Sequence, residues 1–473
     1  MMGRNVLIQL VTSSISGLLT FLTLSLTARL FGPEIIGTLA YLLGLTGLIF
    51  AFSDLGFSRA HVYYTASKQA ASRTLGTFIR IKMILLLISS LLAIIVYRFF
   101  GQNYSWVIFG LILIYELLSR FSETILITFE ALQQAIPQNL TKLISKLAKL
   151  IMVIILTQRL RNVLGLSLTF IAEGFILLLL SLYLIRRFIP LSYDKSLFQK
   201  YFRYSLPFFV IIPLSYLQTN SLIVILKQFW PVKEVGFYSA AANLTGFIKT
   251  LYGAVMIFFF PKIASLYAVK DMKSIQHYTN LTIKYLLIIF TPIFIGLFLL
   301  RQEIIVLVLG ADFISAIPIY SLFLLGMFLL MLFNPYSYVL FACHHHRPLV
   351  KINVISLFLT IILSFLMIPY FGARGAVLVN IIIWIINGMW ILKIIKQRLQ
   401  LKIMPYFYNF IIPALLLLIL SEMIINFYNL TLIIKLLITL ISLSLYLVFL
   451  YSFKVFNKKD IHYFISLIPF ARK

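Results

Sequence analysis

Charged side chains occur at helical spacing inside two apolar stretches of this chain. In the first stretch, steps of four, three and seven residues align four of them on one helical face: Glu116, Arg120, Glu123 and Glu130. In the second stretch, steps of four and three align three basic ones: Lys142, Lys146 and Lys149. Groups in this pattern can pair with one another, or can bind a charged ligand in a hydrated cavity.

The depth of these charged groups in the membrane decides whether they need a partner or water. An ionised side chain at the centre of an apolar span costs about 2.5 to 3.5 kcal/mol, so it usually faces a partner or water. If the two stretches are antiparallel neighbours, equal depth pairs Glu123 with Lys142 or Lys146. It also pairs Glu116 with Lys149. Two interpretations stay open: a structural ion-pair zipper, and a polar wall whose lysines bind an anionic head group.

Lys249 lies in the middle of another apolar span, with no carboxylate at the adjacent positions of its own helix. Those positions hold Thr245, Gly246, Tyr252 and Gly253. A lysine stem reaches about one helical turn, which is too short to bring this ammonium group out of mid-membrane. The sequence therefore favours a Lys249 side chain that faces a lumen over one that pairs with another helix.

The elements that must position these groups are transmembrane helices. Hydrophobic residues make up 62% of the 473 residues, and the mean hydropathy is +1.04. Hydropathy predicts about fourteen spans, at residues 6–30, 35–60, 77–99, 104–130, 134–157, 160–188, 204–229, 236–262, 276–301, 313–342, 347–369, 374–396, 405–427 and 430–453. The connections are short, which leaves no room for an extramembrane domain.

Basic residues are concentrated in alternate connections. The rich connections lie near residues 68–82, 186–203, 262–273, 393–402 and 454–459. The opposite connections are sparse, and they include residues 31–34, 230–235 and 370–374. The positive-inside rule therefore predicts a cell inner (cytoplasmic) membrane protein with both termini in the cytoplasm. Arg59 and His61, at the inner end of the second span, fit ordinary residues of a cytoplasmic connection.

A weak internal repeat occurs at an offset of 199 residues, which superposes residues 33–37 (PEIIG) on residues 232–236 (VKEVG). The offset spans six predicted helices, an even number, so both copies have the same orientation in the membrane. We therefore predict an all-α fold with two pseudo-symmetric six-helix bundles and two additional transmembrane helices, followed by an amphipathic cytoplasmic tail. Their respective bounds are 1–190, 200–398, 403–453 and 457–473.

The sequence disfavours several functions. The net charge is +27, but the basic residues flank apolar spans, so we expect the lipid bilayer and not nucleic acid as the partner. Residues 343–347 (CHHHR) are metal-ligand types, but contiguous helical residues point in different directions, and we predict no metal site. The sequence holds no Walker A motif, nucleophile elbow or Asp-rich sugar-nucleotide site. We expect no cofactor and no enzymatic activity.

Five short motifs occur along the chain in a defined order and spacing. They are residues 28–34 (ARLFGPE), 54–58 (DLGFS), 204–207 (YSLP), 235–241 (VGFYSAA) and 375–376 (GA). In this order they resemble the polysaccharide-biosynthesis flippases of the multidrug, oligosaccharidyl-lipid and polysaccharide exporter superfamily. Arg29 matches an arginine that the wider family uses near its substrate cavity, although an interfacial anchor is the alternative. Asn220 departs from the family, because many relatives have an aspartate there.

The resemblance implies a flippase that moves an undecaprenyl-diphosphate-linked oligosaccharide, such as an O-antigen repeat unit, from the cytoplasmic to the outer leaflet by alternating access. The partners that it implies are this polyprenyl-diphosphate-linked oligosaccharide, the bilayer, and a polysaccharide polymerase with other assembly proteins. The candidates for substrate binding are then Lys249, Arg29, Arg120, Lys142, Lys146 and Lys149. The candidates for charge pairing or gating are Glu116, Glu123, Glu130 and Asn220.

Two other functions stay open. A cation-coupled multidrug exporter of the same superfamily needs buried carboxylates that are free to bind H⁺ or Na⁺, and Asp54, Glu173 and Glu422 are available for that. A membrane-embedded glycan polymerase or acyltransferase needs catalytic residues grouped on one face, commonly on a substantial loop. The short connections argue against this last function.

Overall fold

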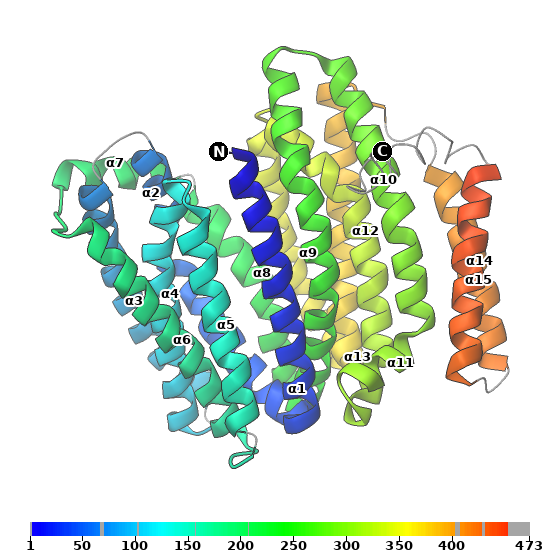
Figure 1. Ribbon diagram of the computed structural model, residues 1–473, viewed down its shortest axis with the longest axis horizontal. Helices are drawn as coiled ribbons and strands as arrows, with labels where there is room; N and C mark the ends of the chain where they lie inside the picture. The colour runs from blue at the N-terminus through cyan, green and yellow to red at the C-terminus, as the bar shows by residue number, and fades with distance from the viewer. Residues whose placement is uncertain are drawn as a thin grey trace. The chain divides into compact units, whose positions relative to one another are not determined.

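The computed structural model describes the backbone of residues 2–66, 71–101, 104–156, 158–206, 208–402, 407–427 and 431–452. All regular structure in these segments is helical, with no strand (Figure 1). The predicted all-α, polytopic fold is confirmed. The amphipathic tail expected at 457–473 lies outside the described residues.

Each predicted span falls on a helix. The helices are α1 Met2–Phe50, α2 Phe57–Ala66, α3 Ala71–Phe100, α4 Trp106–Ala131, α5 Ala135–Leu156, α6 Val163–Ile185, α7 Lys195–Ser205, α8 Phe208–Phe229, α9 Val232–Ala268, α10 Met272–Leu299, α11 Arg301–Val308, α12 Ile317–Ala342, α13 His346–Ile394, α14 Phe407–Phe427 and α15 Leu432–Ser452. Helices α1 and α13 hold two predicted spans each, because the backbone leaves the helical conformation at Gly32 (φ 72°) and Gly372 (φ 57°). Glycine adopts such left-handed angles readily. Eight helical stretches among the described residues are long and apolar enough to cross a membrane.

Polar side chains mark where two of these helices begin. Ser105 Oγ accepts a hydrogen bond from the backbone N–H of Val107 at the start of α4 (3.2 Å). Asn162 Oδ1 accepts one from the N–H of Gly165 at the start of α6 (2.9 Å). Each cap satisfies an N–H group that the first helical turn leaves without an intrahelical partner.

By their contacts, the residues divide into two compact units. Unit 1 comprises Met1–Leu251, Val308–Ile319 and Val350–Ile383, and unit 2 comprises Tyr252–Leu307, Tyr320–Leu349 and Trp384–Lys473. Several of these boundaries fall inside α9, α12 and α13. They therefore differ from the boundaries of the six-helix bundles, and the division into bundles stays a prediction.

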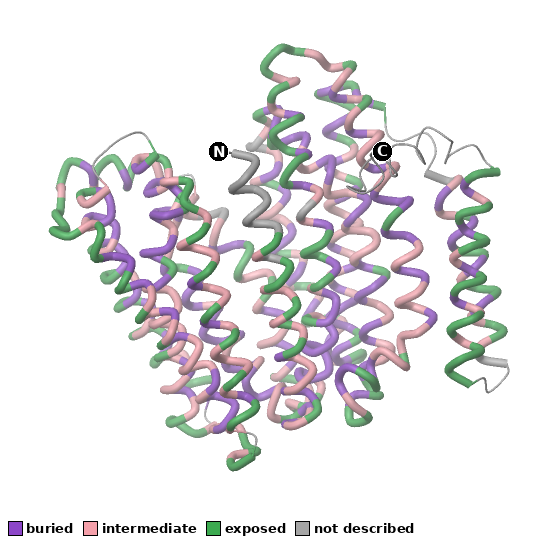
Figure 2. Tube along the Cα trace, in the orientation of Figure 1, coloured by how far each residue is buried: buried purple, intermediate pink, exposed green. Residues whose placement is uncertain are grey.

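Buried residues, purple in Figure 2, occur along the early helices of unit 1, and apolar side chains among them hold these helices together. One cluster joins α3, α4 and α6 through Leu75, Ile125, Leu126, Phe129, Leu177, Leu184 and Ile185. A second cluster joins α2, α3 and α7 through Phe57, Ala60, Phe78, Ile81, Leu197 and Tyr201. In both clusters, residues that lie more than 100 positions apart in sequence share a core.

Helices α1 and α9 meet in unit 1 through a close backbone contact. A Cβ atom on Gly37 would lie 2.0 Å from the carbonyl oxygen of Val232, and one on Gly236 would lie 1.9 Å from that of Pro33. The two contacts are equivalent under the sequence repeat, because Pro33 lies 199 residues before Val232 and Gly37 lies 199 residues before Gly236. The weak sequence repeat therefore corresponds to a reciprocal contact, which only residues without a Cβ atom permit.

The connections that we expect outside (31–34, 230–235 and 370–374) meet at one end of unit 1. The indole Nε1–H of Trp230 donates to the carbonyl oxygen of Ile368 (2.8 Å). The backbone N–H of Ala373 donates to Oε2 of Glu234 (3.4 Å). Together with the glycine contact, these bonds bring the three connections together, as is required if they share one side of the membrane.

The assignment of His61 to an ordinary cytoplasmic connection was wrong. His61 lies on α2, beyond the candidate span Ser14–Ser53, and is fully buried. Its ring nitrogens hydrogen-bond to the hydroxyls of Tyr201 (3.0 Å) and Thr128 (2.8 Å), and the ring stacks on Phe78 at 4.4 Å between centroids. Burial lowers the pKa of His61 to about 3, so the ring is neutral and links α2 to α3, α4 and α7.

Charged pairs attach the last two helices to the rest of unit 2. The Arg301 guanidinium donates two hydrogen bonds to the Glu422 carboxylate of α14. Lys435 of α15 donates to Glu303 of α11 (2.6 Å). Because the charges of α14 and α15 are neutralised by the segment that follows α10, these two helices belong to unit 2.

Replacing Gly236 by alanine should destabilise the protein by about 1 to 3 kcal/mol, because the methyl group has no room beside the Pro33 carbonyl. Gly246→Ala on the same helix is the matched control, since nothing lies within 4 Å of a Cβ atom there. It should be neutral, or stabilising by up to about 1 kcal/mol through helix propensity. Thermal unfolding of the purified variants measures both; equal effects would contradict the close contact.

Candidate functional site

A cavity of about 340 Å³ lies within unit 1. Both halves of α1 line it, together with α4, α5, α6 and α9. Its polar lining consists of Thr20, Thr23, Thr27, Tyr115, Lys146, Lys149, Glu173, Ser239 and Asn243. The structure thus brings two of the lysines expected to bind substrate to one cavity, whose polar groups are mostly hydroxyls on an otherwise apolar wall.

Lys146 is held at the cavity by a neutral group. Its Nζ donates to Oγ1 of Thr20 (3.0 Å), whose own hydroxyl donates to the carbonyl oxygen of Ser16 (2.8 Å). An ammonium group has three N–H donors, so Thr20 accepts only one of them. No carboxylate of the described residues lies within 4 Å of Lys146, although Glu173 of the same cavity attracts it from farther away. Its remaining N–H donors can therefore bind an anionic ligand.

Lys149 is neutralised across the cavity wall. Its Nζ lies 2.9 Å from Oε2 of Glu173 on α6, and both side chains are 15% exposed. The same ammonium group lies 3.3 Å from the centroid of the Phe170 ring. This largely buried pair neutralises the charge of Lys149. The three charged lining side chains therefore carry one net positive charge, which belongs to Lys146.

Ser239 of α9 presents an unsatisfied hydroxyl. The residue is 6% exposed, lines the cavity, and its Oγ has no hydrogen-bond partner among the described residues. A buried hydroxyl without a partner costs about 1 to 3 kcal/mol, so water or a ligand in the cavity would stabilise it. Tyr115 and Phe170 pack edge to face nearby, with centroids 5.1 Å apart. The cavity thus combines hydroxyls, an amide and aromatic rings with one net positive charge. This combination suits a polar, anionic ligand.

The described residues form none of the α4–α5 ion pairs of the zipper interpretation. Glu116 pairs within its own helix, with Nε of Arg120 at 2.8 Å, and Lys149 pairs with Glu173. The reason is that α6 packs along both α4 and α5 more extensively than those two pack on each other. The basic face of α5 therefore meets the α6 carboxylate, which the sequence offered only as a free ion-coupling group.

Arg120 sits outside the lining of the cavity. Its guanidinium lies over the rings of Phe50 (5.4 Å to the centroid) and Tyr216 (5.5 Å). With Glu116 it forms a pair whose side chains are 16% and 13% exposed. These contacts give Arg120 a packing role between α4, α1 and α8.

The other acidic candidates of α4 also lie outside the cavity lining. Glu123 and Glu130 are exposed, and Glu130 accepts a hydrogen bond from Gln138 (3.2 Å). Lys142 is half-buried, and no carboxylate of the described segments pairs with it. None of these three forms the predicted interhelical pair.

Asn220 lies at the contact between α8 and α1. Its amide nitrogen donates to the carbonyl oxygen of Tyr216 (2.9 Å), and a Cβ atom on Gly47 would lie 3.0 Å from it. The side chain is therefore packed against the α1 backbone. Its expected part in gating stays a prediction.

Arg29 and Lys249 are both exposed. The stem of Arg29 packs against Gly310, with 3.5 Å between its Cγ and a Cβ atom built on that glycine. Lys249 lies on α9, six residues beyond Asn243, and the lining of the cavity does not include it. Binding of substrate by either residue stays a prediction.

Each carboxylate that was available for ion coupling has a basic partner. Asp54 accepts from Lys82 (2.8 Å), and Glu173 accepts from Lys149. In unit 2, Glu422 accepts from Arg301. Within the described segments no group of three or more His, Cys, Asp or Glu residues gathers that could hold a metal ion.

Sequence reasoning missed the cavity hydroxyls and the role of Glu173. Glu173 was detectable, because it is the only carboxylate in its apolar span and such a group needs a partner. Thr20 and Ser239 carried no such signal, since hydroxyls in apolar helices commonly bond to their own backbone.

Solved structures with the same fold are membrane transporters. The lipid II flippase MurJ in an inward closed conformation aligns with a TM-score of 0.74 at 20% identity, over 95% of this chain and 100% of that chain. A multidrug resistance MATE family transporter of the MOP superfamily, inward-facing, aligns with a TM-score of 0.62 at 15% identity, over 81% and 95%. A MOP superfamily transporter from Pyrococcus furiosus aligns at 0.56 and 12% identity, over 84% and 97%. The chain therefore has the fold of that superfamily.

The sequence places the chain more narrowly within this class. The family model described as polysaccharide biosynthesis protein matches residues 26–318, which is more than half of the chain. The protein belongs to the polysaccharide biosynthesis protein family. No curated protein sequence matches it.

Exchanging the charges of Lys149 and Glu173 tests the pairing seen here. Lys149→Glu and Glu173→Lys should each cost about 3 kcal/mol, because each leaves like charges facing one another in a low-dielectric site. The double exchange should recover at least about 1 kcal/mol of the summed loss, measured by thermal unfolding and membrane protein level. Lys146→Glu with Glu123→Lys is the control pair and should show no such recovery; recovery there instead would restore the zipper.

Proposed function

We propose that this protein is a flippase for an undecaprenyl-diphosphate-linked oligosaccharide, of the O-antigen repeat-unit type, which it moves from the cytoplasmic to the outer leaflet of the inner membrane. Three findings support the proposal: membership of the polysaccharide biosynthesis family, a fold shared with a lipid II flippase, and the cavity in unit 1. The proposal assigns no catalytic step to the chain.

The observation that carries the proposal is the state of Lys146. Its ammonium group lies at a cavity within apolar helices and has a threonine hydroxyl as its partner. Holding a charge there is costly unless a counter-charge arrives, and the diphosphate of a lipid-linked sugar is such a counter-charge. The hydroxyls of Thr20 and Ser239 and the Asn243 amide can hydrogen-bond the sugar or the phosphate oxygens.

The membrane potential would assist export of such a substrate. An interior-negative potential contributes about 2.3 kcal/mol per elementary charge per 100 mV. A diphosphate that carries about two charges would gain about 4.6 kcal/mol if it crossed the whole potential uncompensated. In the proposed cycle, the two predicted six-helix bundles alternate access to the substrate, while its isoprenoid tail stays in lipid.

We infer the orientation from the distribution of basic residues. Both termini lie in the cytoplasm, and the three sparse connections that meet in unit 1 face outward. A protein that delivers repeat units to the outer leaflet would work beside a polysaccharide polymerase and other assembly proteins there.

A cation-coupled multidrug exporter is the second candidate, because MATE transporters share the fold. The ion pairs favour the flippase. A proton or Na⁺ that binds to Asp54, Glu173 or Glu422 must first displace a lysine or arginine that lies within hydrogen-bond distance.

Loss of the protein should leave lipid-linked repeat units on the cytoplasmic leaflet while surface glycan falls. Lys146→Gln, expressed in the deletion strain, should keep its protein level but lower surface glycan by about tenfold or more, because a charge-assisted hydrogen bond contributes about 1.5 to 3 kcal/mol. Lys146→Arg should retain part of the function, since the charge survives with a different geometry. Surface glycan, leaflet distribution of the lipid intermediate and protein level are the measurements.

Lys195→Gln, an exposed lysine of α7 outside the cavity, is the control and should behave as wild type. Full surface glycan with Lys146→Gln at matched expression would overturn the role of Lys146. Unchanged surface glycan in the deletion strain, with altered drug susceptibility, would establish the exporter instead.

A further inference from the structure

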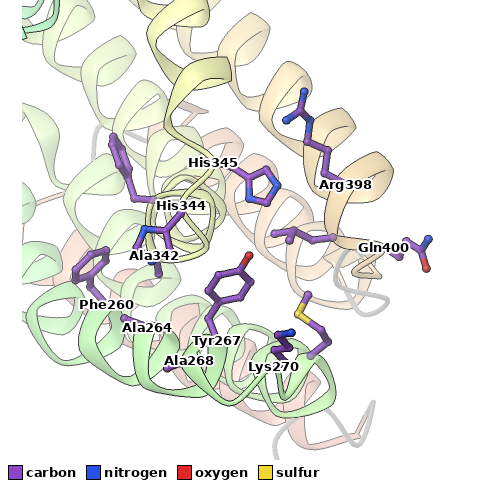
Figure 3. A pocket seen from close by; sticks show the side chains of 13 residues that line it. Phe260, Ala264, Tyr267, Ala268, Lys270, Ala342, His344, His345, Arg398 and Gln400 are labelled. Atoms are coloured by element: carbon purple, nitrogen blue, oxygen red, sulfur yellow. The ribbon is translucent and has the colours of Figure 1, made fainter. Parts of the chain in front are cut away.

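A second, larger pocket lies in unit 2, where three helices end. Its volume is about 900 Å³, and its walls come from the end of α9 with the turn to α10, the end of α12 with the turn to α13, and the end of the π-helix Ile395–Leu399 that follows α13. Figure 3 shows these three ends around one space, with Tyr267 pointing its hydroxyl toward the side where His345 lies. Two of the three turns lie in connections rich in basic residues, 262–273 and 393–402.

The polar lining of this pocket is basic. Lys270, His344, His345 and Arg398 line it, and no carboxylate is among the described lining residues. Asp271 follows Lys270 directly in the sequence, but it caps α10: its Oδ1 accepts a hydrogen bond from the N–H of Ser274 (3.0 Å). A concave surface with this charge attracts anions.

The backbone at the rim is unusual for the residues that occupy it. Lys270, His344 and Gln400 have φ angles of 57°, 59° and 52°, and all three line the pocket. A left-handed residue after a helix is usually glycine, because other residues are strained there by about 1 to 2 kcal/mol. Here all three positions carry a long or aromatic polar side chain. Strained residues of this kind commonly cluster at functional sites.

Helix capping accounts for one of the basic lining residues, His345, but not for Lys270. Basic side chains are common at helix C-termini because they neutralise the last carbonyl groups. In this pocket, backbone N–H groups already bond to those carbonyls: Lys270 and Asp271 donate to Tyr267 and Leu266. In the same way, His344 and His345 donate to the carbonyls of Phe341 and Leu340. The Lys270 side chain is therefore not needed as a cap, whereas the His345 ring does act there, because its Nδ1–H donates to the carbonyl oxygen of Cys343 (2.8 Å).

The pocket also has an apolar wall. Phe260 and Phe341 line it and are 39% and 45% exposed, next to Ala264, Ala268 and Ala342. Large apolar side chains at the edge of a basic pocket suit a ligand that carries both a charge and a hydrocarbon chain. A free phosphate ion would leave this wall uncovered.

We propose that this pocket binds the phosphate-bearing head group of an anionic phospholipid from the cytoplasmic leaflet. Lys270 and Arg398 contact the phosphate, His344 and His345 line the head-group space, and the acyl chains lie along Phe260 and Phe341. Basic pockets on the cytoplasmic side of transmembrane helices are suited to such head groups. The site is separate from the cavity of unit 1, and the proposal does not rest on the transport function.

The full chain, purified in a neutral detergent, is titrated with phosphatidylglycerol, and bound lipid is counted by native mass spectrometry. The variant Lys270→Gln with Arg398→Gln should weaken the tightest phosphatidylglycerol site by at least about tenfold, as expected for lost charge-assisted hydrogen bonds. The matched control is Lys273→Gln with Lys396→Gln, which removes the same charge from exposed residues near the same turns but outside the lining. It should bind as wild type.

Equal binding by the two double variants would overturn the site, because the general attraction of a basic protein would then explain it. Inorganic phosphate is the second probe. If it binds alone with the same dependence on Lys270 and Arg398, the occupant is a soluble phosphate and the lipid assignment is wrong. If the pocket variant fails to fold, wild type is irradiated with a photoactivatable phosphatidylglycerol. Labelling should include residues 260–272 or 341–345; labelling confined to other segments would overturn the proposal.

Discussion

A charge inside an apolar helix must meet an opposite charge or a polar cavity, and much of unit 1 is arranged around this constraint. Asp54 with Lys82, Glu116 with Arg120 and Glu173 with Lys149 each satisfy it locally. The first pair connects the segment after the end of α1 to α3, and the third connects α5 to α6, so the same contacts that neutralise charge also fix helix positions. Lys146 differs, because a threonine hydroxyl is its partner and a cavity lies beside it.

The chemistry of the cavity follows from that difference. A single net positive charge among hydroxyls and aromatic rings favours an anionic, oxygen-rich ligand. A site with unpaired carboxylates would instead favour a lipophilic cation. The reciprocal contact of Gly37 and Gly236 brings α9, with Ser239 and Asn243, against α1. The glycines thus decide which hydroxyl and amide groups reach the cavity that Lys146 lines.

The helical spans could be predicted from the sequence, because hydropathy is a local signal. The partner of each buried charge could not be predicted from the sequence. Pairing depends on which helices are neighbours, and α6 packs along α4 and α5, so the α5 lysines face Glu173 and not Glu123. His61 was misassigned because burial by α4 and α7 is a tertiary property. The pocket of unit 2 joins residues from three turns, which no sequence spacing relates.

The most direct test of the central claim is translocation by the purified protein in proteoliposomes. A short-chain polyprenyl-diphosphate oligosaccharide is incorporated in both leaflets, and an impermeant glycosidase outside cleaves only what it reaches. With this protein, the substrate of the inner leaflet should become accessible over time, whereas a neutral phospholipid analogue of similar chain length should stay in place. Cleavage that stops at the same fraction as in protein-free vesicles would contradict the account.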